Sequence, residues 1–180
     1  MYLQKPTPSL FGLAGGQNVV YLGTFSRLLL PSIRISFMVL SPELSALYRK
    51  KADQYNQTAS KAEQIALCQF IRDGHLAAQT RKLKRLYSVK LKALRSAVRE
   101  VFGKDSQIQT GAAGTSLALT LSTTLTWQEL QKKAQTNGLR LQLLREAPGK
   151  ITLILSCSSM PVADFVPACK LLKDISQIQN

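Results

Sequence analysis

The N-terminal quarter of the chain contains two apolar runs that predict neighbouring strands. Residues 19–22 form a β-branched apolar run that ends at Gly23, and residues 33–40 form a second, largely apolar run that ends at Ser41. Apolar runs of this length are typical of strands that are buried on both faces. Residues 1–18, which are rich in proline, glycine and serine, predict an irregular lead-in. We therefore expect two buried strands after an irregular N-terminal segment.

Helical spacing dominates the pattern from residue 42 to residue 102 and predicts three helices. Ser41 is a typical N-cap for the first helix. Ser60 and Glu63 have the spacing of a capping box at the start of the second. The predicted helices are residues 42–55, 60–72 and 75–102. Such a long helical stretch predicts a connector between two packed units.

After Gly103 the pattern changes to short alternating strands and amphipathic helices. Thr126 is a typical N-cap for one of these helices, and Asn137 with Gly138 ends it. The predicted strands are residues 115–121, 139–144 and 151–156, and the predicted helices are residues 127–136 and 161–175. The fold class is therefore mixed, α/β to α+β, with a small α+β domain at the C-terminal end.

The composition indicates a globular protein with an excess of positive charge. Of the 180 residues, 45% are hydrophobic and 19% are charged, and the formal net charge is +14. Such a charge favours polyanionic partners, nucleic acid among them. Eight cations in the predicted helix 75–102 alternate with leucines that must face a core, which makes a solvated helix face the simpler interpretation. They are Arg81, Lys82, Lys84, Arg85, Lys90, Lys92, Arg95 and Arg99.

The cysteine and histidine content does not predict a metal site. Cys68, Cys157 and Cys169 lack metal-ligand spacing, and we expect reduced, buried thiols. His75 is the only histidine, so no second imidazole completes a ligand set. The sequence shows neither an apolar run of membrane-spanning length nor the pattern of a signal peptide, which predicts a cytoplasmic protein without a membrane partner.

The most specific pattern follows the first predicted strand. Residues 21–27 read Tyr-Leu-Gly-Thr-Phe-Ser-Arg, and Pro31 and Arg34 follow at fixed distances. This segment resembles the lysine turn of fold-type I pyridoxal-phosphate (PLP) proteins. Together with the patterns at residues 8–13 and 70–76, it most closely resembles the aminotransferase-like effector domain of MocR-type regulators in the GntR superfamily.

The resemblance covers about residues 8 to 175 and implies the C-terminal portion of a PLP-dependent transferase fold of the aspartate aminotransferase type. It implies a remnant of the large PLP-binding domain at residues 1–41, connecting helices at 42–103, and a small α+β domain at 104–180. We expect the chain to be the C-terminal portion of a longer protein.

The resemblance also implies roles at the cofactor, pyridoxal 5'-phosphate. Thr24 and Ser26 would offer hydroxyls, and Arg34 a guanidinium, to the cofactor phosphate. Arg27 stands where the family has the lysine that forms the Schiff base. Because an arginine stays protonated, it does not attack an aldehyde, and we expect neither a catalytic residue nor transaminase activity.

Further parts of the family's site have no counterpart in the sequence. The aspartate and the aromatic side chain that hold the cofactor ring belong to earlier strands of the family's large domain. Alignment on Ser156 places Ile154 where many aminotransferases carry an arginine for the substrate carboxylate. These departures favour binding over catalysis.

The leading hypothesis is therefore the effector-binding domain of a MocR/GntR-type transcriptional regulator. The resemblance implies a homodimer, a small-molecule effector or amino acid as ligand, and DNA bound through a winged-helix domain further upstream. One alternative is part of a PLP-dependent aminotransferase, of the 2-aminoadipate or aromatic type, with a lysine-to-arginine change. The second alternative is a basic nucleic-acid-binding module that acts through residues 81–99.

Overall fold

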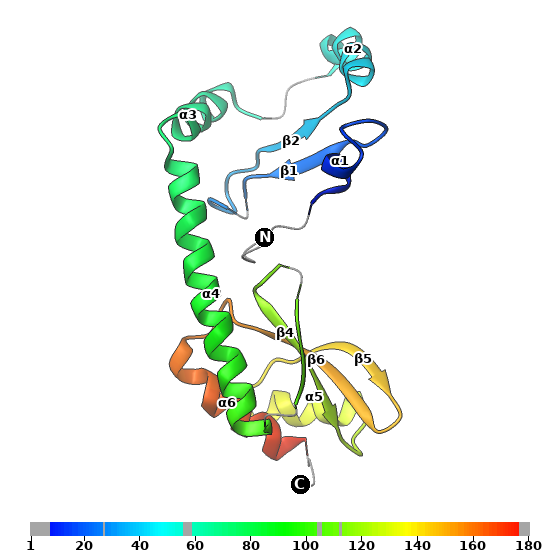
Figure 1. Ribbon diagram of the computed structural model, residues 1–180, viewed down its shortest axis with the longest axis vertical. Helices are drawn as coiled ribbons and strands as arrows, with labels where there is room; N and C mark the ends of the chain where they lie inside the picture. Colours follow the sequence, from blue (N-terminus) through cyan, green and yellow to red (C-terminus); the bar gives the residue numbers. More distant parts are fainter. Residues whose placement is uncertain (1–7, 27, 56–58, 104–105, 112, 177–180) are drawn as a thin grey trace. The chain divides into compact units, whose positions relative to one another are not determined.

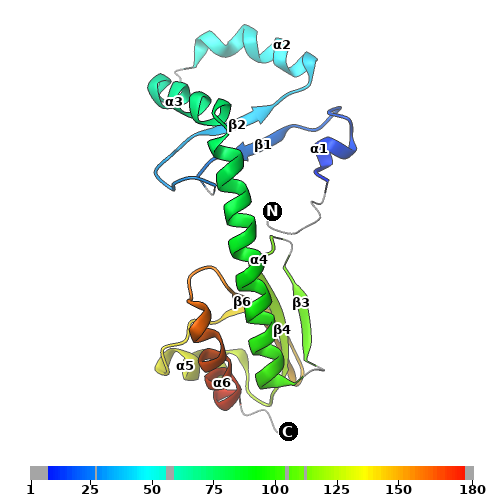
Figure 2. The ribbon, with the colours of Figure 1, turned by 60° about the vertical axis from the view of Figure 1, so that its left-hand side comes forward.

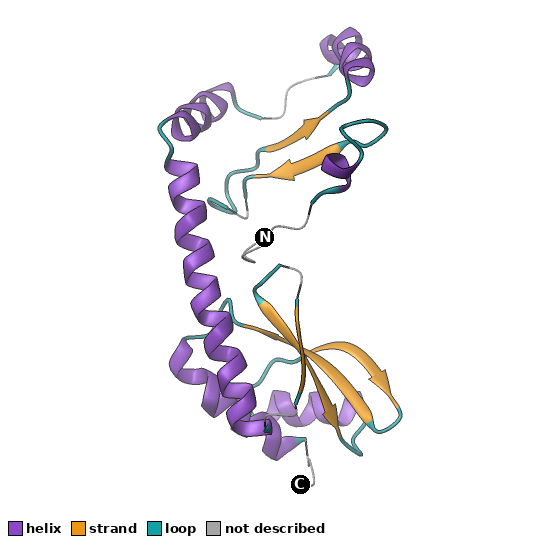
Figure 3. Ribbon diagram, in the orientation of Figure 1, coloured by secondary structure: helices purple, strands orange, loops and turns teal. Residues whose placement is uncertain are grey.

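The structure is a computed structural model, and it describes residues 8–26, 28–55, 59–103, 106–111 and 113–176. These residues fall into two compact units whose boundary lies between Lys82 and Leu83, inside the longest helix. We name the described residues up to Lys82 the N-terminal unit and those from Leu83 onward the C-terminal unit. Figure 1 follows the chain through both units, and Figure 3 shows their helices and strands.

The N-terminal unit is built on a two-stranded antiparallel sheet. β1 (Tyr21–Thr24) pairs with β2 (Ser36–Val39), and Gly23 lies opposite Phe37. Both predicted strands are present, although β1 begins two residues later than the apolar run that predicts it and β2 is shorter than its run. The helices are α1 (Leu10–Leu13), α2 (Pro42–Lys51) and α3 (Lys61–Arg72); a 3-10 turn at Ala52–Gln54 follows α2, and α4 (His75–Phe102) begins in this unit. The short helix α1 lies in the segment that we expected to be irregular.

Both strands are exposed, so the prediction of two buried strands was wrong. Leu22 is 74% exposed and Phe37 is 40% exposed. Among the described residues of this unit, only Ile35 is buried. The reason is that the sheet holds only two strands here, so the apolar side chains that a larger layered sheet would cover remain in solvent.

The helix ends of the N-terminal unit follow the local sequence signals only in part. The Ser41 hydroxyl accepts a hydrogen bond from the backbone N–H at the third helical position at 3.4 Å, which confirms the predicted N-cap. Ser60 makes no side-chain bond of this kind, so the capping box predicted with Glu63 does not form. The Gln64 side chain instead donates to the Ala59 carbonyl at 3.1 Å and anchors the first turn of α3.

The C-terminal unit contains a four-stranded antiparallel sheet in the order β3-β4-β6-β5. The strands are β3 (Gln107–Thr110), β4 (Ser116–Ser122), β5 (Gln142–Ala147) and β6 (Lys150–Ser156). β4 and β6 confirm two of the predicted strands. β5 lies further along the chain than predicted, and β3 was missed.

Three helices pack on one face of this sheet (Figures 1 and 2): α4, α5 (Trp127–Thr136) and α6 (Phe165–Ile175), the last preceded by a 3-10 turn at Val162–Asp164. The leucines at alternate positions of β4 are buried against them, as the period of a strand requires. The core also contains side chains from each of the three helices and from β6. Its buried members are Leu94, Ala97, Val98, Leu117, Leu119, Leu121, Leu130, Ile151, Leu153, Cys157, Phe165, Cys169 and Leu172. The C-terminal unit therefore holds nearly all of the buried core that the structure describes.

The predicted bounds of α4 and α5 are confirmed at both ends. Gly103 follows α4 with a φ of 90°, a left-handed conformation that favours glycine at a helix C-terminus. At the start of α5, the Thr126 hydroxyl accepts from the Glu129 N–H at 3.4 Å and the Glu129 carboxylate accepts from the Thr126 N–H at 2.8 Å. Local sequence signals at the helix ends are therefore sufficient to predict the bounds of both helices.

The thiols differ in exposure. Cys157 and Cys169 are buried in the C-terminal unit, as predicted, whereas Cys68 on α3 is exposed, so that part of the prediction was wrong. The reason is the same as for the strands, because the N-terminal unit offers α3 little core to pack against. None of the helices that the structure describes is both long enough and apolar enough to cross a membrane.

Candidate functional site

The segment that follows β1 brings Thr24 and Ser26 together. The Thr24 and Ser26 hydroxyls lie 3.3 Å apart, and the Ser26 backbone N–H donates to Thr24 Oγ1, also at 3.3 Å. These bonds fold the chain into a tight turn directly after the strand. The turn therefore presents two neighbouring hydroxyls, and their role at a cofactor phosphate stays a prediction.

Both hydroxyls are held by the segment that leads into β2. Ser26 Oγ donates to the Ile33 carbonyl at 2.5 Å, and Thr24 Oγ1 donates to the Ile35 carbonyl at 3.4 Å. The Phe25 N–H also donates to the Ile35 carbonyl, at 3.2 Å. To donate to a bound anion, each hydroxyl must rotate away from its carbonyl. The hydrogen bonds to the Ile33 and Ile35 carbonyls therefore hold the turn in place without a ligand.

Arg34 lies between the two isoleucines whose carbonyls receive these bonds. Its side chain is exposed. Within the described part of the chain, no hydrogen bond or ion pair of the Arg34 guanidinium is found. A free guanidinium with five donors is suited to binding a phosphate in bidentate fashion. Arg27, at the position of the family's lysine, lies outside the described residues.

Gly23 is required by the ring that faces it across the sheet. A Cβ atom at Gly23 would collide with the Phe37 ring, its partner in the register of β1 and β2. The Phe37 ring also lies 5.3 Å from the Phe25 ring and 6.1 Å from the Tyr21 ring, and Tyr21 in turn contacts Phe11 of the first helix at 6.1 Å. Aromatic stacking at these distances fixes the turn on the sheet. Sequence reasoning missed this cluster, whose local signal is an aromatic residue two positions before Gly23 and another two positions after it, Tyr21 and Phe25.

An apolar cavity of about 430 Å³ adjoins the turn inside the N-terminal unit. Ile33 and Ile35 line it from the segment before β2, and Leu67 and Phe70 line it from α3. Glu63 is one of the few polar residues at its wall. Sequence reasoning did not find this cavity, because it depends on how α3 and the segment before β2 come together and not on any motif.

The position assigned to the substrate carboxylate lies in the C-terminal unit. Ile154 is half-buried on β6 and lines a cavity of about 100 Å³ together with Ser156. Arg140, which sequence reasoning did not consider, is exposed and lines the same cavity. No group of three or more histidine, cysteine or acidic side chains placed to hold a metal ion occurs among the described residues.

The comparisons with curated proteins found transcriptional regulators. The chain is 30% identical over 176 residues to the uncharacterized HTH-type transcriptional regulator YdeL of Bacillus subtilis, and this alignment covers 96% of this chain and 38% of YdeL. It is 35% identical over 140 residues to the uncharacterized HTH-type transcriptional regulator YhdI of the same organism, covering 78% of this chain and 30% of YhdI. It is 30% identical over 140 residues to the probable rhizopine catabolism regulatory protein MocR of Rhizobium meliloti, covering 78% of this chain and 28% of that protein. The chain thus spans between 28% and 38% of the length of these relatives.

The comparisons with solved structures found aminotransferases. LysN, an alpha-aminoadipate aminotransferase from Thermus thermophilus, aligns with 98% of this chain and 47% of its own length at a TM-score of 0.73 and 23% identity. The multiple substrate aminotransferase from Thermococcus profundus aligns with 98% of this chain and 45% of its own length at a TM-score of 0.75 and 22% identity. No family model matches the chain. The chain is a homologue of MocR/GntR-type transcriptional regulators over most of its length, and it has the fold of part of a fold-type I, PLP-dependent aminotransferase.

Proposed function

We propose that this chain is an effector-binding, aminotransferase-like module of a MocR/GntR-type regulator and that it does not catalyse transamination. The observation that carries the proposal is the exposed Arg34, which has no ion pair in the described structure and lies between Ile33 and Ile35. The carbonyls of these two isoleucines accept the hydrogen bonds of the Ser26 and Thr24 hydroxyls. This set is suited to the phosphate of pyridoxal 5'-phosphate or of a related phosphorylated effector.

The three side chains contribute unequally to phosphate binding. Arg34 supplies charge and paired donors without any rearrangement. Thr24 and Ser26 already donate to backbone carbonyls, so rotating either hydroxyl toward a phosphate exchanges one hydrogen bond for another. Arg34 is therefore the main source of affinity, and the hydroxyls mainly orient the ligand.

The absence of catalysis follows from the residue at position 27. Bound pyridoxal phosphate would supply an electron sink for amino-group chemistry, and the protein would contribute a neutral lysine amine as the nucleophile. Arg27 remains a cation at any ordinary pH and offers no such amine. The proposal includes a homodimer, a small-molecule effector or amino acid as ligand, and DNA binding through a winged-helix domain outside this chain.

The experiment compares pyridoxine 5'-phosphate with pyridoxine by isothermal titration calorimetry. Neither compound carries an aldehyde, so surface lysines do not react with them and only the phosphate distinguishes the two. We expect the phosphate ester to bind more tightly, and Arg34→Gln to reduce that preference about three- to tenfold, because an exposed guanidinium is screened by solvent and salt.

Arg49→Gln is the matched control, since Arg49 is an exposed arginine of the same unit outside the turn. It should leave the preference unchanged. Equal binding of the two compounds, or an Arg34→Gln variant that keeps the full preference, would contradict the phosphate site. Amino-group transfer between an amino acid and a 2-oxo acid, faster with the protein than with free pyridoxal 5'-phosphate, would contradict the absence of catalysis.

A further inference from the structure

The C-terminal unit carries a stripe of cations along the exposed side of α4. In this unit the buried side of α4 is formed by Leu94, Ala97 and Val98. Arg85, Lys92 and Arg99 are all exposed and follow one another at intervals of seven residues. Since seven residues make about two turns at 3.6 residues per turn, these three side chains lie along one line on the opposite side of the helix. We name this line the α4 stripe.

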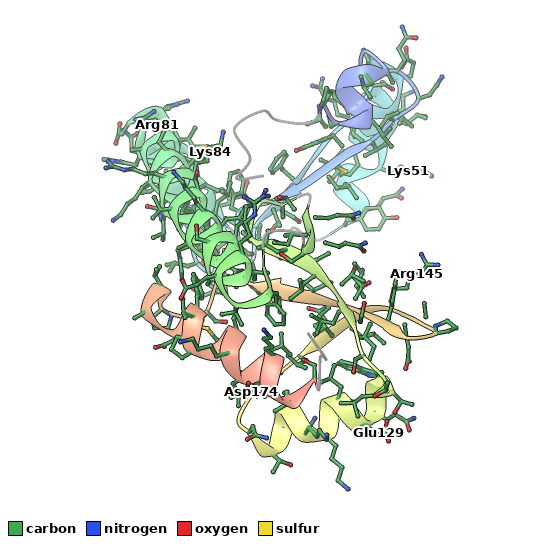
Figure 4. All side chains as sticks on the ribbon, turned by 60° about the horizontal axis from the view of Figure 1, so that its bottom comes forward. Lys51, Arg81, Lys84, Glu129, Arg145 and Asp174 are labelled. Atoms are coloured by element: carbon green, nitrogen blue, oxygen red, sulfur yellow. The ribbon has the colours of Figure 1, made fainter. Side chains whose placement is uncertain are left out.

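Among the described residues, no acidic side chain pairs with the α4 stripe. Glu100 is the only acidic residue between His75 and Phe102. No ion pair of Arg85, Lys92 or Arg99 is found with the rest of the described chain. Glu129 and Asp174 project from α5 and α6, whereas Lys84 adds a further exposed cation to α4 (Figure 4). Other exposed cations of this unit lie on α5, β6 and α6, but Arg85, Lys92 and Arg99 form a straight line on one helix, and no described side chain pairs with them.

We propose that the α4 stripe binds the phosphate backbone of double-stranded DNA. At a rise of 1.5 Å per residue, the three cations are spaced by about 10.5 Å and span about 21 Å. A duplex carries one negative charge per about 1.7 Å of its axis when both strands are counted, so about 21 Å of duplex carries roughly twelve phosphates, and a helix lying against it faces part of them. Lysine and arginine side chains on a straight helix can reach several of them without reading any base.

The same face does not fit single strands or membranes. Proteins that bind single strands stack the bases on exposed aromatic rings. Between Arg85 and Arg99 the only aromatic residue is Tyr87, which is half-buried and contacts the core. A helix that lies on a membrane inserts a continuous apolar side, whereas Leu94, Ala97 and Val98 of α4 are buried in the core. The large apolar side chains of α4 that are exposed in this unit are Leu86 and Val89, two among the described residues.

The test measures binding of the full chain to a fluorescently labelled DNA duplex of arbitrary sequence by anisotropy, over a range of salt concentrations. The variant Arg85→Gln/Lys92→Gln/Arg99→Gln removes the stripe. Each phosphate contact contributes about 0.9 to the slope of log K against log salt, so the slope should fall by about 2.7 and binding should weaken about a hundredfold near 0.15 M salt.

Two further variants separate the stripe from other effects. Lys132→Gln/Lys150→Gln/Lys170→Gln removes three exposed cations from α5, β6 and α6, so it lowers the formal net charge of +14 by the same amount. It should change the slope by less than one contact. Arg85→Lys/Arg99→Lys keeps the charges and should bind as the unmodified chain does, which tests the proposal independently of any effect of glutamine on folding.

Equal losses in the two glutamine variants would show diffuse attraction to a basic protein and would overturn the proposal. Absence of DNA binding even at low salt would do the same. Stripe-dependent binding to polyglutamate or to phosphatidylserine vesicles, without stripe-dependent binding to DNA, would assign the surface to another partner and would also overturn it.

Discussion

Thr123 is predicted to hold the C-terminal end of α6 onto the sheet. Its side chain is 7% exposed, and its hydroxyl donates to the Ser176 carbonyl at 2.7 Å while it accepts from the Leu125 N–H at 3.2 Å. Thr123→Val keeps the shape of the side chain and removes both bonds. The Ser176 carbonyl, in a residue with 0% exposure, then loses its partner, whereas the half-buried Leu125 N–H can bond to water. An unsatisfied buried polar group costs about 1–3 kcal/mol, so we expect a loss of about 2 kcal/mol in the free energy of unfolding.

The assay is thermal unfolding followed by the fluorescence of Trp127, the only tryptophan. Its ring packs against the core of the C-terminal unit and so reports on that unit. For a unit of this size, 2 kcal/mol corresponds to a decrease of about 8–16 °C in Tm. Thr124→Val is the control, because Thr124 is exposed and should change stability by no more than about 0.5 kcal/mol. Thr123→Ser, which keeps the hydroxyl, should recover most of the loss. If Thr123→Val and Thr124→Val unfold at the same temperature, the two hydrogen bonds do not contribute as we argue.

Two other predictions concern titratable groups, and they follow from exposure and hydrogen bonding. The hydrogen bonds from the Thr126 backbone N–H and hydroxyl lower the pKa of the Glu129 carboxyl below its ordinary value of 4.5. This carboxylate therefore stabilises the fold above pH 4.5, and its contribution is lost as the pH falls through the lower folded value. Tm by Trp127 fluorescence should decrease in that range, and Glu129→Gln should flatten the decrease; an unchanged pH profile in Glu129→Gln would refute the capping box as its cause. Burial, with a smaller contribution from Glu100, raises the pKa of Cys169 to about 11, and burial also raises that of Cys157. A thiol reagent at mildly alkaline pH should thus modify Cys68 first, as peptide mapping would show, and equal rates at all three thiols would contradict the buried placement of Cys157 and Cys169.

Local sequence signals predicted the ends of some helices and not of others. The bounds of α4 and α5 were predictable because a left-handed glycine, Gly103, ends the first and the Thr126–Glu129 capping box begins the second. The capping box predicted at Ser60 failed although the residues have the right spacing. A helix cap requires the right side-chain rotamers as well as the right spacing. At the start of α3, the Gln64 side chain makes a hydrogen bond to the Ala59 carbonyl instead.

The strands show what local signals leave out. β3 was missed because Gln107–Thr110 has mostly polar side chains, and its place in the sheet comes from pairing with β4. The apolar run at β2 correctly predicted a strand, but the prediction that this strand is buried was wrong. The hydrophobicity of a strand determines how much free energy its burial would contribute, whereas its actual burial depends on which other layers of the fold cover it.

The candidate site was predictable from a motif only at the level of residue types. The hydroxyls of Thr24 and Ser26 do meet, but the carbonyls of Ile33 and Ile35 that receive them were not visible in the sequence. Nor was the collision with Phe37 that requires Gly23. Both depend on the pairing of β1 with β2, a contact across more than ten residues.

The contrast between the two units bears directly on the role of position 27. A lysine becomes a nucleophile near neutral pH when burial lowers its pKa from about 10.4, because otherwise fewer than about one in a thousand such groups are neutral at pH 7. The described neighbours of this position provide little burial: Thr24 is exposed, Ser26 and Leu28 are half-buried, and Ile35 is the only buried residue of the N-terminal unit. In this chain, we therefore expect Arg27→Lys to supply an amine that the described residues around it bury only in part. The arginine at position 27 and the limited burial of its described neighbours both support the proposal of a site that binds a phosphate through Arg34.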